Sequence, residues 1–309
     1  MNDIISSSEE TEETTEEETD IPSKVVISVA QLTSTSNLQH NFDTIEQLVH
    51  DSAKNHQSRM LFLPECFAFM GESAQQTIEH AEALDGPLFT RYRSLAKQYG
   101  IAISFGGFHE KHPSDPTKIF NSHVLVDSRG EIRSLYRKLH LFDVDLPHKR
   151  FKMMESAITA PGSNIMTCGD IEECTPLVFG VSICFDIRFP ELYLLMRNQG
   201  ANCLLAPSAF TRHTGHMGHW HTLLKARAIE NQSFVVAAAQ VGRHNAKRES
   251  YGHSLVVDPW GQVICDMDKA SPSVQRVELD MQLLDSARES IPLNKRGDIY
   301  SLMYHHRSL

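Results

Sequence analysis

The sequence predicts one α+β domain in which large mixed sheets carry helices on their outer faces. Two patterns favour this fold class. Early in the chain, short apolar runs alternate with stretches of helical periodicity, and later runs are joined in pairs by turn signals. No internal repeat and no Gly/Ser-rich linker divides the body of the chain. Strand–helix units mixed with hairpins are typical of a single α+β domain, although periodicity leaves open whether there is one sheet or two.

The first part of the body alternates strands with helices. Continuous apolar runs at 25–32, 60–65 and 101–107 predict buried strands. Between these runs, apolar residues recur at helical spacing in 38–49 and again in 88–99. That spacing predicts two helices with one buried face each.

Hairpins and further strand–helix units make up the rest of the chain. We expect hairpins at 123–136 and 254–267, each around a glycine-containing turn. Residues 138–163 show little periodicity and are expected to form a long loop. The remaining predicted elements are strands at 177–184, 202–208, 234–241 and 274–279, a helix beginning at Pro190, and a helix at 219–231. A polar arm is expected to close the chain.

The net charge is concentrated at the N-terminus. Residues 1–20 contain nine acidic and no basic side chains, so they account for nine of the ten formal negative charges. A segment with few apolar residues and dense like charge cannot offset the entropy of ordering. We therefore predict a disordered acidic tail at 1–22 and one folded domain at 23–309. The near-neutral body does not indicate a nucleic-acid partner.

Targeting and membrane signals are not apparent in the sequence. The acidic N-terminal segment has neither the Arg-rich composition of a mitochondrial presequence nor the apolar core of a secretory signal. No apolar run approaches the length of a membrane span. The six cysteines form no CxxC pair and are expected to be reduced thiols. These observations predict a cytoplasmic protein with no membrane partner.

Three chemically capable residues stand at strand ends. Glu65 follows the apolar run that begins at 60, Cys184 ends the run at 177–184, and Lys138 leaves the first hairpin. Active sites in sheet proteins gather at such exits. Taken singly, each residue has a plain structural alternative: a buried core thiol, a helix cap or a solvated surface amine.

The chemistry of these three residues is coherent. A cysteine needs an adjacent base or cation to act as a nucleophile at neutral pH. At a desolvated strand end, we expect a raised pKa for Glu65, which would suit it to accept the thiol proton. Lys138 would stabilise the oxyanion formed when the thiol attacks a carbonyl, and the backbone N–H of Phe185 would add a second donor.

The sequences around these residues resemble the motif blocks of the nitrilase superfamily of carbon–nitrogen hydrolases. FLPE at 62–65, YRKLHLF at 136–142 and GVSICFDIRFPEL at 180–192 occur in the expected order. The resemblance extends over residues 24–300. It implies a nitrilase-like four-layer αββα sandwich of two mixed sheets flanked by helices. It also implies a cofactor-free enzyme that forms a homodimer or higher homo-oligomer through helices near the nucleophile.

Carried to the matching positions, the resemblance implies the roles of individual residues. Cys184 would attack an amide carbon and form a thioester, with Glu65 as general base and then acid. Lys138 would stabilise the tetrahedral intermediates, and Glu155 matches a second acidic position that supports the lysine and substrate. The expected reaction is hydrolysis of a terminal amide, a non-peptide carbon–nitrogen bond of a linear amide, to a carboxylate and ammonia.

Within the superfamily, the chain is most similar to Nit-type amidases that act on deaminated glutathione, a metabolite-repair activity. The blocks that carry this likeness are residues 206–215, 219–232 and 237–261. An ω-amidase for 2-oxoglutaramate-type keto-acid amides is the alternative substrate class. A catalytically silent binding protein of the same fold is a further alternative, which the presence of the whole triad disfavours. One departure is His221, where relatives usually have Glu.

Several polar residues near these blocks have open interpretations. Phe210, Thr211 and His219 lie where the family pocket tends to be, or are ordinary loop and helix-start residues. Asp186, Arg188 and Glu191 are expected to form a buried structural ion pair rather than to contact substrate. The histidines His213, His216, His219 and His221 lack the spacing of a zinc site, so no metal site is predicted.

Overall fold

The computed structural model describes residues 22–146 and 151–301. The tail predicted for 1–22 lies outside the described residues, apart from Pro22. No helix in the described part of the chain is long and apolar enough to cross a membrane.

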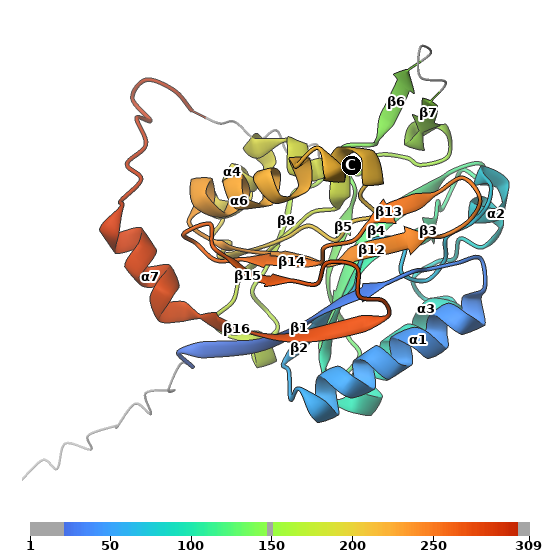
Figure 1. The fold of residues 1–309 in the computed structure, drawn as a ribbon, viewed down its shortest axis with the longest axis horizontal. Helices are drawn as coiled ribbons and strands as arrows, with labels where there is room; N and C mark the ends of the chain where they lie inside the picture. Colours follow the sequence, from blue (N-terminus) through green and yellow to red (C-terminus); the bar gives the residue numbers. More distant parts are fainter. Residues whose placement is uncertain (1–21, 147–150, 302–309) are drawn as a thin grey trace, which may run out of the picture.

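Two sheets lie between two helical layers (Figure 1). Helices α1 (Leu38–His50) and α3 (Pro87–Tyr99) cover one outer face. Helices α4 (Pro190–Asn198) and α6 (His219–Asn231) cover the other. The four-layer αββα sandwich that the resemblance implied is therefore confirmed.

The larger sheet has eight strands and is built around β1. In spatial order it contains β13 (Glu249–Tyr251), β12 (Ala239–Arg243), β1 (Lys24–Leu32), β2 (Met60–Phe62), β3 (Ala102–Lys111), β4 (Ile119–Val126) and β5 (Ile132–Arg137), with β16 (Ser273–Asp280) also paired to β1. Strands β1 to β3 are parallel, and β3 to β5 are antiparallel. Along most of its length β1 pairs with β16, whereas only its last two residues pair with β12.

The smaller sheet has six strands. In spatial order it contains β15 (Val263–Asp266), β14 (Leu255–Val257), β11 (Phe234–Ala237), β10 (Cys203–Leu205), β9 (Phe179–Val181) and β8 (Met166–Cys168). Its central strands β9, β10 and β11 are parallel. A separate hairpin, β6 (Asp143–Leu146) with β7 (Phe151–Met154), projects from the top of the molecule in Figure 1.

The remaining helical elements lie between strands or follow the last strand. They are η1 (Asp51–Asn55), α2 (Ala74–Glu79), η3 (Glu155–Ala157), η4 (Glu172–Cys174), η5 (Cys184–Arg188), α5 (Arg212–His216) and α7 (Met281–Ser290). Helix ends follow local chemistry. The Asn37 side chain caps α1, Pro87 begins α3, and Gly100 ends α3 at φ 65°, a conformation that glycine adopts without strain.

Three apolar clusters account for the layers. One lies between the sheets and takes alternate residues of facing strands, such as Phe62 of β2 and Phe179 of β9. A second packs α1 and α3 on the larger sheet, and a third packs α4 and α6 on the smaller one. In β10, Cys203 and Leu205 join the middle cluster while Leu204 joins the outer one. Because these strands are buried on both faces, they read as continuous apolar runs in the sequence.

Three stretches differ from the sequence prediction. The expected loop at 138–163 contains the β6–β7 hairpin and η3. The run at 234–241, predicted as one strand, divides into β11 in the smaller sheet and β12 in the larger one. The expected polar arm begins with helix α7, which Asp280 caps. The division of 234–241 depends on pairing with distant strands, which local periodicity does not encode.

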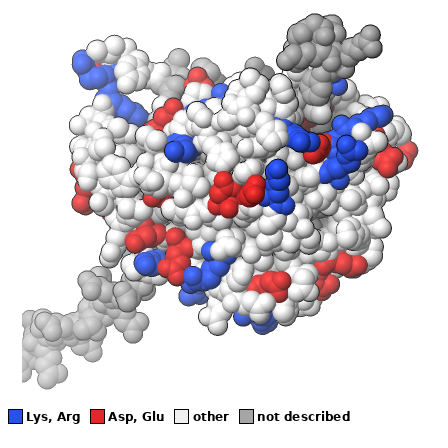
Figure 2. Space-filling model, in the orientation of Figure 1, with Lys and Arg blue, Asp and Glu red and all other residues white. Residues whose placement is uncertain are grey.

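Charged side chains of both signs are intermixed on the face in Figure 2. Much of this face is uncharged. The distribution agrees with the near-neutral body inferred from the sequence.

Candidate active site

Glu65 is held at the junction of the two sheets. It follows β2, and its backbone carbonyl accepts a hydrogen bond from the Gln240 side chain at 3.0 Å. One carboxylate oxygen, Oε2, accepts from the backbone N–H of Ala209 at 2.8 Å. Ala209 lies beyond β10 of the smaller sheet, so this carboxylate bridges segments that leave different sheets. The side chain is buried.

Lys138 lies between two carboxylates. Its Nζ donates to Glu65 Oε1 at 3.0 Å and to Glu155 at 3.0 and 2.9 Å. Asn121, in the neighbouring strand β4, donates to Glu65 at 2.9 Å and to Glu155 at 3.2 Å. The backbone N–H of Phe142 completes the support of Glu155 at 2.7 Å. One ammonium and one amide therefore fix both carboxylates.

Cys184 begins the η5 turn in a strained backbone conformation. Its φ is 46°, which is unusual for a residue with a side chain. Its N–H donates to the carbonyl of Pro207 at 3.0 Å. Such outliers gather at functional sites, where the surrounding structure holds them in place. The thiol lies within the electrostatic range of both Glu65 and Lys138.

The turn after Cys184 is supported differently from the sequence expectation. The buried Asp186 carboxylate accepts from Tyr136 Oη, from the backbone N–H of Ile183, and from His140 at 2.7 Å. Arg188 instead lines a cavity and lies above the rings of Phe185 and Phe210. The expected buried ion pair among Asp186, Arg188 and Glu191 is therefore wrong, because His140 pairs with Asp186 instead of the arginine.

The charges at the site are strongly coupled. Burial acts to raise the pKa of Glu65, but Lys138, Arg248 and the Ala209 N–H outweigh it and lower that pKa to about 2. The expectation of a raised pKa is therefore wrong. Burial opposes the charge on Lys138, yet Glu155 and Glu65 raise its pKa well above the ordinary value. Burial and the Glu65 charge raise the pKa of the Cys184 thiol. The resting site contains a neutral thiol beside an ionised Glu65–Lys138 pair.

These groups line one cavity of about 740 Å³. Glu65, Lys138, Glu155 and Cys184 all contribute to its surface. Of the other predicted residues, Phe185, Phe210 and Thr211 also line it. His219 does not belong to the lining, but its Nδ1 lies 3.3 Å from Arg188 Nη2. The volume is within the range of pockets that bind drug-sized molecules.

Neither of two cations in this cavity was assigned to the site from the sequence, because Arg188 was expected in a structural ion pair and Arg248 was not singled out. Arg188 and Arg248 both line it and are half-buried. Within residues 22–146 and 151–301, neither guanidinium lies within ion-pair distance of a carboxylate, although the charge of Arg248 acts on Glu65 from farther away. Burial lowers the pKa of Arg188. The available signals were the motif blocks, since Arg188 lies in the block at 180–192 and Arg248 in the block at 237–261.

Cys66 and His109 form a second, partly buried pair at the cavity wall. Cys66 Sγ lies 3.5 Å from His109 Nε2. Burial raises the pKa of the Cys66 thiol to about 12 and lowers the pKa of His109 to about 4. Both groups are therefore neutral near pH 7, which separates Cys66 from a low-pKa reactive thiol.

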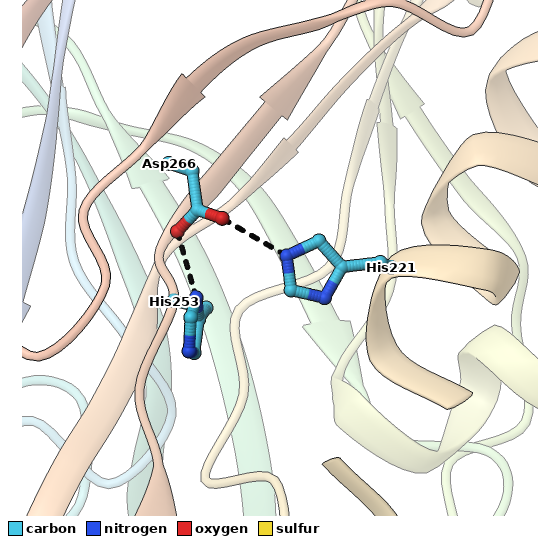
Figure 3. A group of neighbouring side chains, drawn as sticks. All are labelled: His221, His253 and Asp266. Atoms are coloured by element: carbon cyan, nitrogen blue, oxygen red, sulfur yellow. Dashed lines mark hydrogen bonds and ion pairs between the residues drawn. The ribbon is translucent and has the colours of Figure 1, made fainter. Parts of the chain in front are cut away.

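Outside this cavity, the structure divides the four histidines near α6. His221 meets His253 and Asp266 (Figure 3), a group whose nitrogen and oxygen atoms lie within 4.8 Å of one another. His213 lines the catalytic cavity, and His216 contacts Arg212. Their closeness in sequence therefore does not produce a shared site.

Comparison with known proteins gives concordant matches. Residues 26–289 match the family model described as carbon–nitrogen hydrolase. Deaminated glutathione amidase of Dictyostelium discoideum is 45% identical over 273 residues, which are 86% of this chain and 91% of that protein. The NitFhit crystal structure from Caenorhabditis elegans is 41% identical with a TM-score of 0.83, and the match covers 93% of this chain and 68% of that one. Saccharomyces cerevisiae Nit3, described as a member of branch 10 of the nitrilase superfamily, is 29% identical with a TM-score of 0.78, covering 90% and 97%.

Proposed function

This chain belongs to the carbon–nitrogen hydrolase family, and we propose that it is an amidase whose substrate is deaminated glutathione. The observation that carries the proposal is the arrangement of Lys138 between Glu65 and Glu155 in the cavity that Cys184 lines. A cation fixed beside a nucleophilic thiol and a base suits attack on an amide carbonyl.

The first step is proton transfer coupled to attack. The Cys184 proton passes to Glu65 as sulfur bonds to the amide carbon, and the carbonyl electrons move onto oxygen. Because the lowered pKa of Glu65 disfavours a free thiolate paired with a protonated glutamate, transfer is expected to accompany attack. Negative charge then leaves the carboxylate and appears on the substrate oxygen, where Lys138 and the proposed Phe185 N–H would stabilise it.

The second half completes hydrolysis. Protonated Glu65 gives its proton to the leaving nitrogen as the carbon–nitrogen bond breaks, which leaves a thioester on Cys184. Glu65 then takes a proton from water, whose oxygen attacks the thioester, and the thiol is regenerated as the carboxylate forms. The leaving group depends on the substrate. A primary ω-amide releases ammonia, whereas deaminated glutathione, which lacks a primary amide, releases the amine of a dipeptide.

The two unpaired arginines support the choice of substrate. Deaminated glutathione carries a carboxylate at each end, and an ω-amide of a keto acid carries only one. Arg188 and Arg248 place two guanidinium groups in the cavity without carboxylate partners among the described residues. Guanidinium groups bind carboxylates through paired hydrogen bonds. A cavity of about 740 Å³ also accommodates the longer molecule.

The proposal is tested by offering purified protein deaminated glutathione and 2-oxoglutaramate in parallel. Dipeptide release is measured for the first and ammonia for the second, with Cys184→Ala as the control. A higher kcat/KM for deaminated glutathione supports the proposal. A higher value for 2-oxoglutaramate moves the enzyme to the ω-amidases. If the folded wild-type protein hydrolyses neither substrate, both substrate assignments are contradicted. If Cys184→Ala hydrolyses either substrate, the assignment of Cys184 as nucleophile is contradicted.

The roles of the arginines have a matched test. We expect Arg188→Gln and Arg248→Gln each to raise KM for deaminated glutathione by about tenfold or more, the loss of one charge-assisted contact. Arg212→Gln is the control, because Arg212 also lines the cavity but pairs with Glu249 at 2.9 Å. Equal KM values in all three variants would contradict carboxylate recognition by Arg188 and Arg248.

Assembly and location complete the proposal. We propose a homodimer or higher homo-oligomer, supported by the exposed apolar residues Ile229 of α6 and Trp260 of the β14–β15 turn. Sedimentation equilibrium of wild type and Ile229→Glu tests it, and a wild-type monomer at micromolar concentration contradicts it.

The six free cysteines support a reducing compartment, proposed to be the cytoplasm. Fractionation of cells expressing the tagged chain tests the location. The proposed folded domain remains 23–309, with 1–22 as its acidic tail.

A further inference from the structure

Three potential metal ligands from distant parts of the chain meet outside the catalytic cavity. His221 lies near the start of α6, His253 follows β13, and Asp266 ends β15 (Figure 3). His221 Nε2 lies 2.9 Å from one Asp266 oxygen, and His253 Nδ1 lies 2.8 Å from the other. Imidazole nitrogen and carboxylate oxygen are preferred ligands of zinc and related cations.

The His253 ring is held in place before any ligand binds. It stacks on Tyr251 with ring centres 4.5 Å apart. Its backbone has a φ of 58°, and it is fixed by hydrogen bonds from its N–H to Asp268 and from Trp220 Nε1 to its carbonyl. A strained backbone that several contacts maintain is typical of functional positions.

A second carboxylate stands behind the same ring. His253 Nε2 lies 3.5 Å from Asp268 Oδ1, and the Asp268 N–H donates to Asp266 Oδ1 at 2.9 Å. Histidines that bind metals usually donate their other ring N–H to a carboxylate. Asp268 is placed to fix the tautomer in which His253 Nδ1 is free to coordinate.

We propose that His221, His253 and Asp266 form a binding site for one divalent transition-metal cation of the zinc class, with water as the remaining ligand. The three side chains are 30%, 17% and 32% exposed, so the cation and its water reach the site from solvent. When the cation binds, it replaces the two hydrogen bonds that the imidazoles of His221 and His253 donate to Asp266. Each neutral imidazole then carries its proton on the ring nitrogen that does not face the cation. The ligand atoms, within 4.8 Å at present, close to about 3.5 Å around a tetrahedral ion.

The site would connect α6 to the β14–β15 hairpin beside the catalytic cavity. Trp220 lies next to His221 in sequence, and its Nε1 donates a hydrogen bond to the His253 carbonyl. Its ring also packs on that of Phe210, with ring centres 4.9 Å apart. Phe210 lines the catalytic cavity. A bound cation would therefore hold α6 and the β14–β15 hairpin together next to the wall of the catalytic cavity. This inference is independent of the proposed substrate.

The test titrates tag-free, EDTA-treated full-length protein with CoCl₂ and ZnCl₂. We expect one equivalent of Co²⁺ with an absorption spectrum of nitrogen and oxygen ligation, and a higher unfolding midpoint with Zn²⁺, because a ligand that binds only the native state stabilises it. Asp266→Asn and His221→Ala should lose both responses. His40→Gln, which removes an exposed histidine from α1, should retain them.

Two outcomes would overturn the proposal. One is unchanged binding in His221→Ala and Asp266→Asn. The other is a sulfur-to-cobalt charge-transfer band, which would place the metal on cysteine. Unfolding curves in EDTA show whether each variant folds. If Asp266→Asn fails to fold, His221→Ala decides, since His221 contributes one side-chain hydrogen bond to the cluster among the described residues.

Discussion

At the scale of single residues, the buried charge of Lys138 governs the proposed chemistry. Two carboxylates surround one ammonium, and in the proposed mechanism the Cys184 thiol is the group that gives up a proton. If the thiol ionised first, a third negative charge would join Glu65 and Glu155 around a single cation. Attack on a carbonyl avoids this, because the new charge forms on the substrate as Glu65 is neutralised. The site therefore favours reaction with substrate over thiolate formation in its absence.

The charge states predict a flat pH profile. The pKa of Glu65 is lowered to about 2, and the pKa values of Cys184 and Lys138 are raised well above their ordinary values of 9.0 and 10.5. None of the three titrates in the neutral range, so kcat/KM should stay within about twofold between about pH 5 and pH 8. The measurement is kcat/KM across that range at constant ionic strength. A fall in kcat/KM below about pH 6 would contradict this prediction and would indicate a general base with a raised pKa.

The sequence shows where the candidate catalytic residues lie, but not in which direction the pKa of Glu65 shifts. Glu65 and Cys184 follow apolar strands, so their positions are visible locally. The pKa direction of Glu65 depends on Lys138, Arg248 and Ala209, which lie far along the chain. A local pattern shows desolvation but not the partners that offset it, and this explains the wrong expectation.

At the scale of elements, the run at 234–241 shows where periodicity stops being informative. Its apolar residues satisfy a strand pattern throughout, yet β11 pairs with β10 and β12 pairs with β1. Ala238 lies between the two strands, where its carbonyl accepts from Ser208. The change of sheet brings Gln240 against Glu65, so this crossing helps to build the site. Only tertiary pairing specifies it.

Close packing of strand β3 against the Glu65 segment gives a prediction at this scale. A methyl group at Gly107 would lie 2.8 Å from Asn121 Oδ1 and 3.1 Å from Glu65 Cα. We expect Gly107→Ala to displace the base and reduce kcat by about 10²-fold, the effect of a small misplacement of a catalytic group. Steady-state kinetics tests this, with Gly169→Ala as the control because its methyl meets Val178 at an ordinary 3.4 Å. Wild-type kcat in Gly107→Ala would rule out this account of the packing.

At the scale of the whole molecule, the two sheets are joined by polar contacts as well as by apolar packing. His123 in β4 lies 2.7 Å from Ser104 Oγ and 2.9 Å from the carbonyl of Ser182, two residues before Cys184. Because that carbonyl can only accept, Nδ1 carries the proton and Nε2 accepts from the serine. Within the larger sheet, His244 after β12 makes a hydrogen bond with the carbonyl of Ser34 after β1. Both rings are buried in their neutral form.

Neutral buried histidines make the stability of the whole fold sensitive to mild acid. Burial lowers the pKa of His109, His123 and His244 from 6.5 to about 4. Between these values the unfolded chain binds more protons, so their contribution is complete above pH 6.5 and is lost as pH falls towards 4. Each fully protonating histidine changes the unfolding free energy by about 1.4 kcal/mol per pH unit.

Urea unfolding at pH values from 7.5 down to about 4.5 measures this loss. The slope of the unfolding free energy against pH should approach the value that corresponds to an uptake of about three protons on unfolding. His123→Gln should lower the slope by about one proton, whereas His40→Gln, at an exposed position in α1, should leave it unchanged. A slope near zero between pH 6.5 and 5 would mean that these rings gain charge in the native state. In that case the contact between β4 and the strand leading to Cys184 could not depend on a neutral His123.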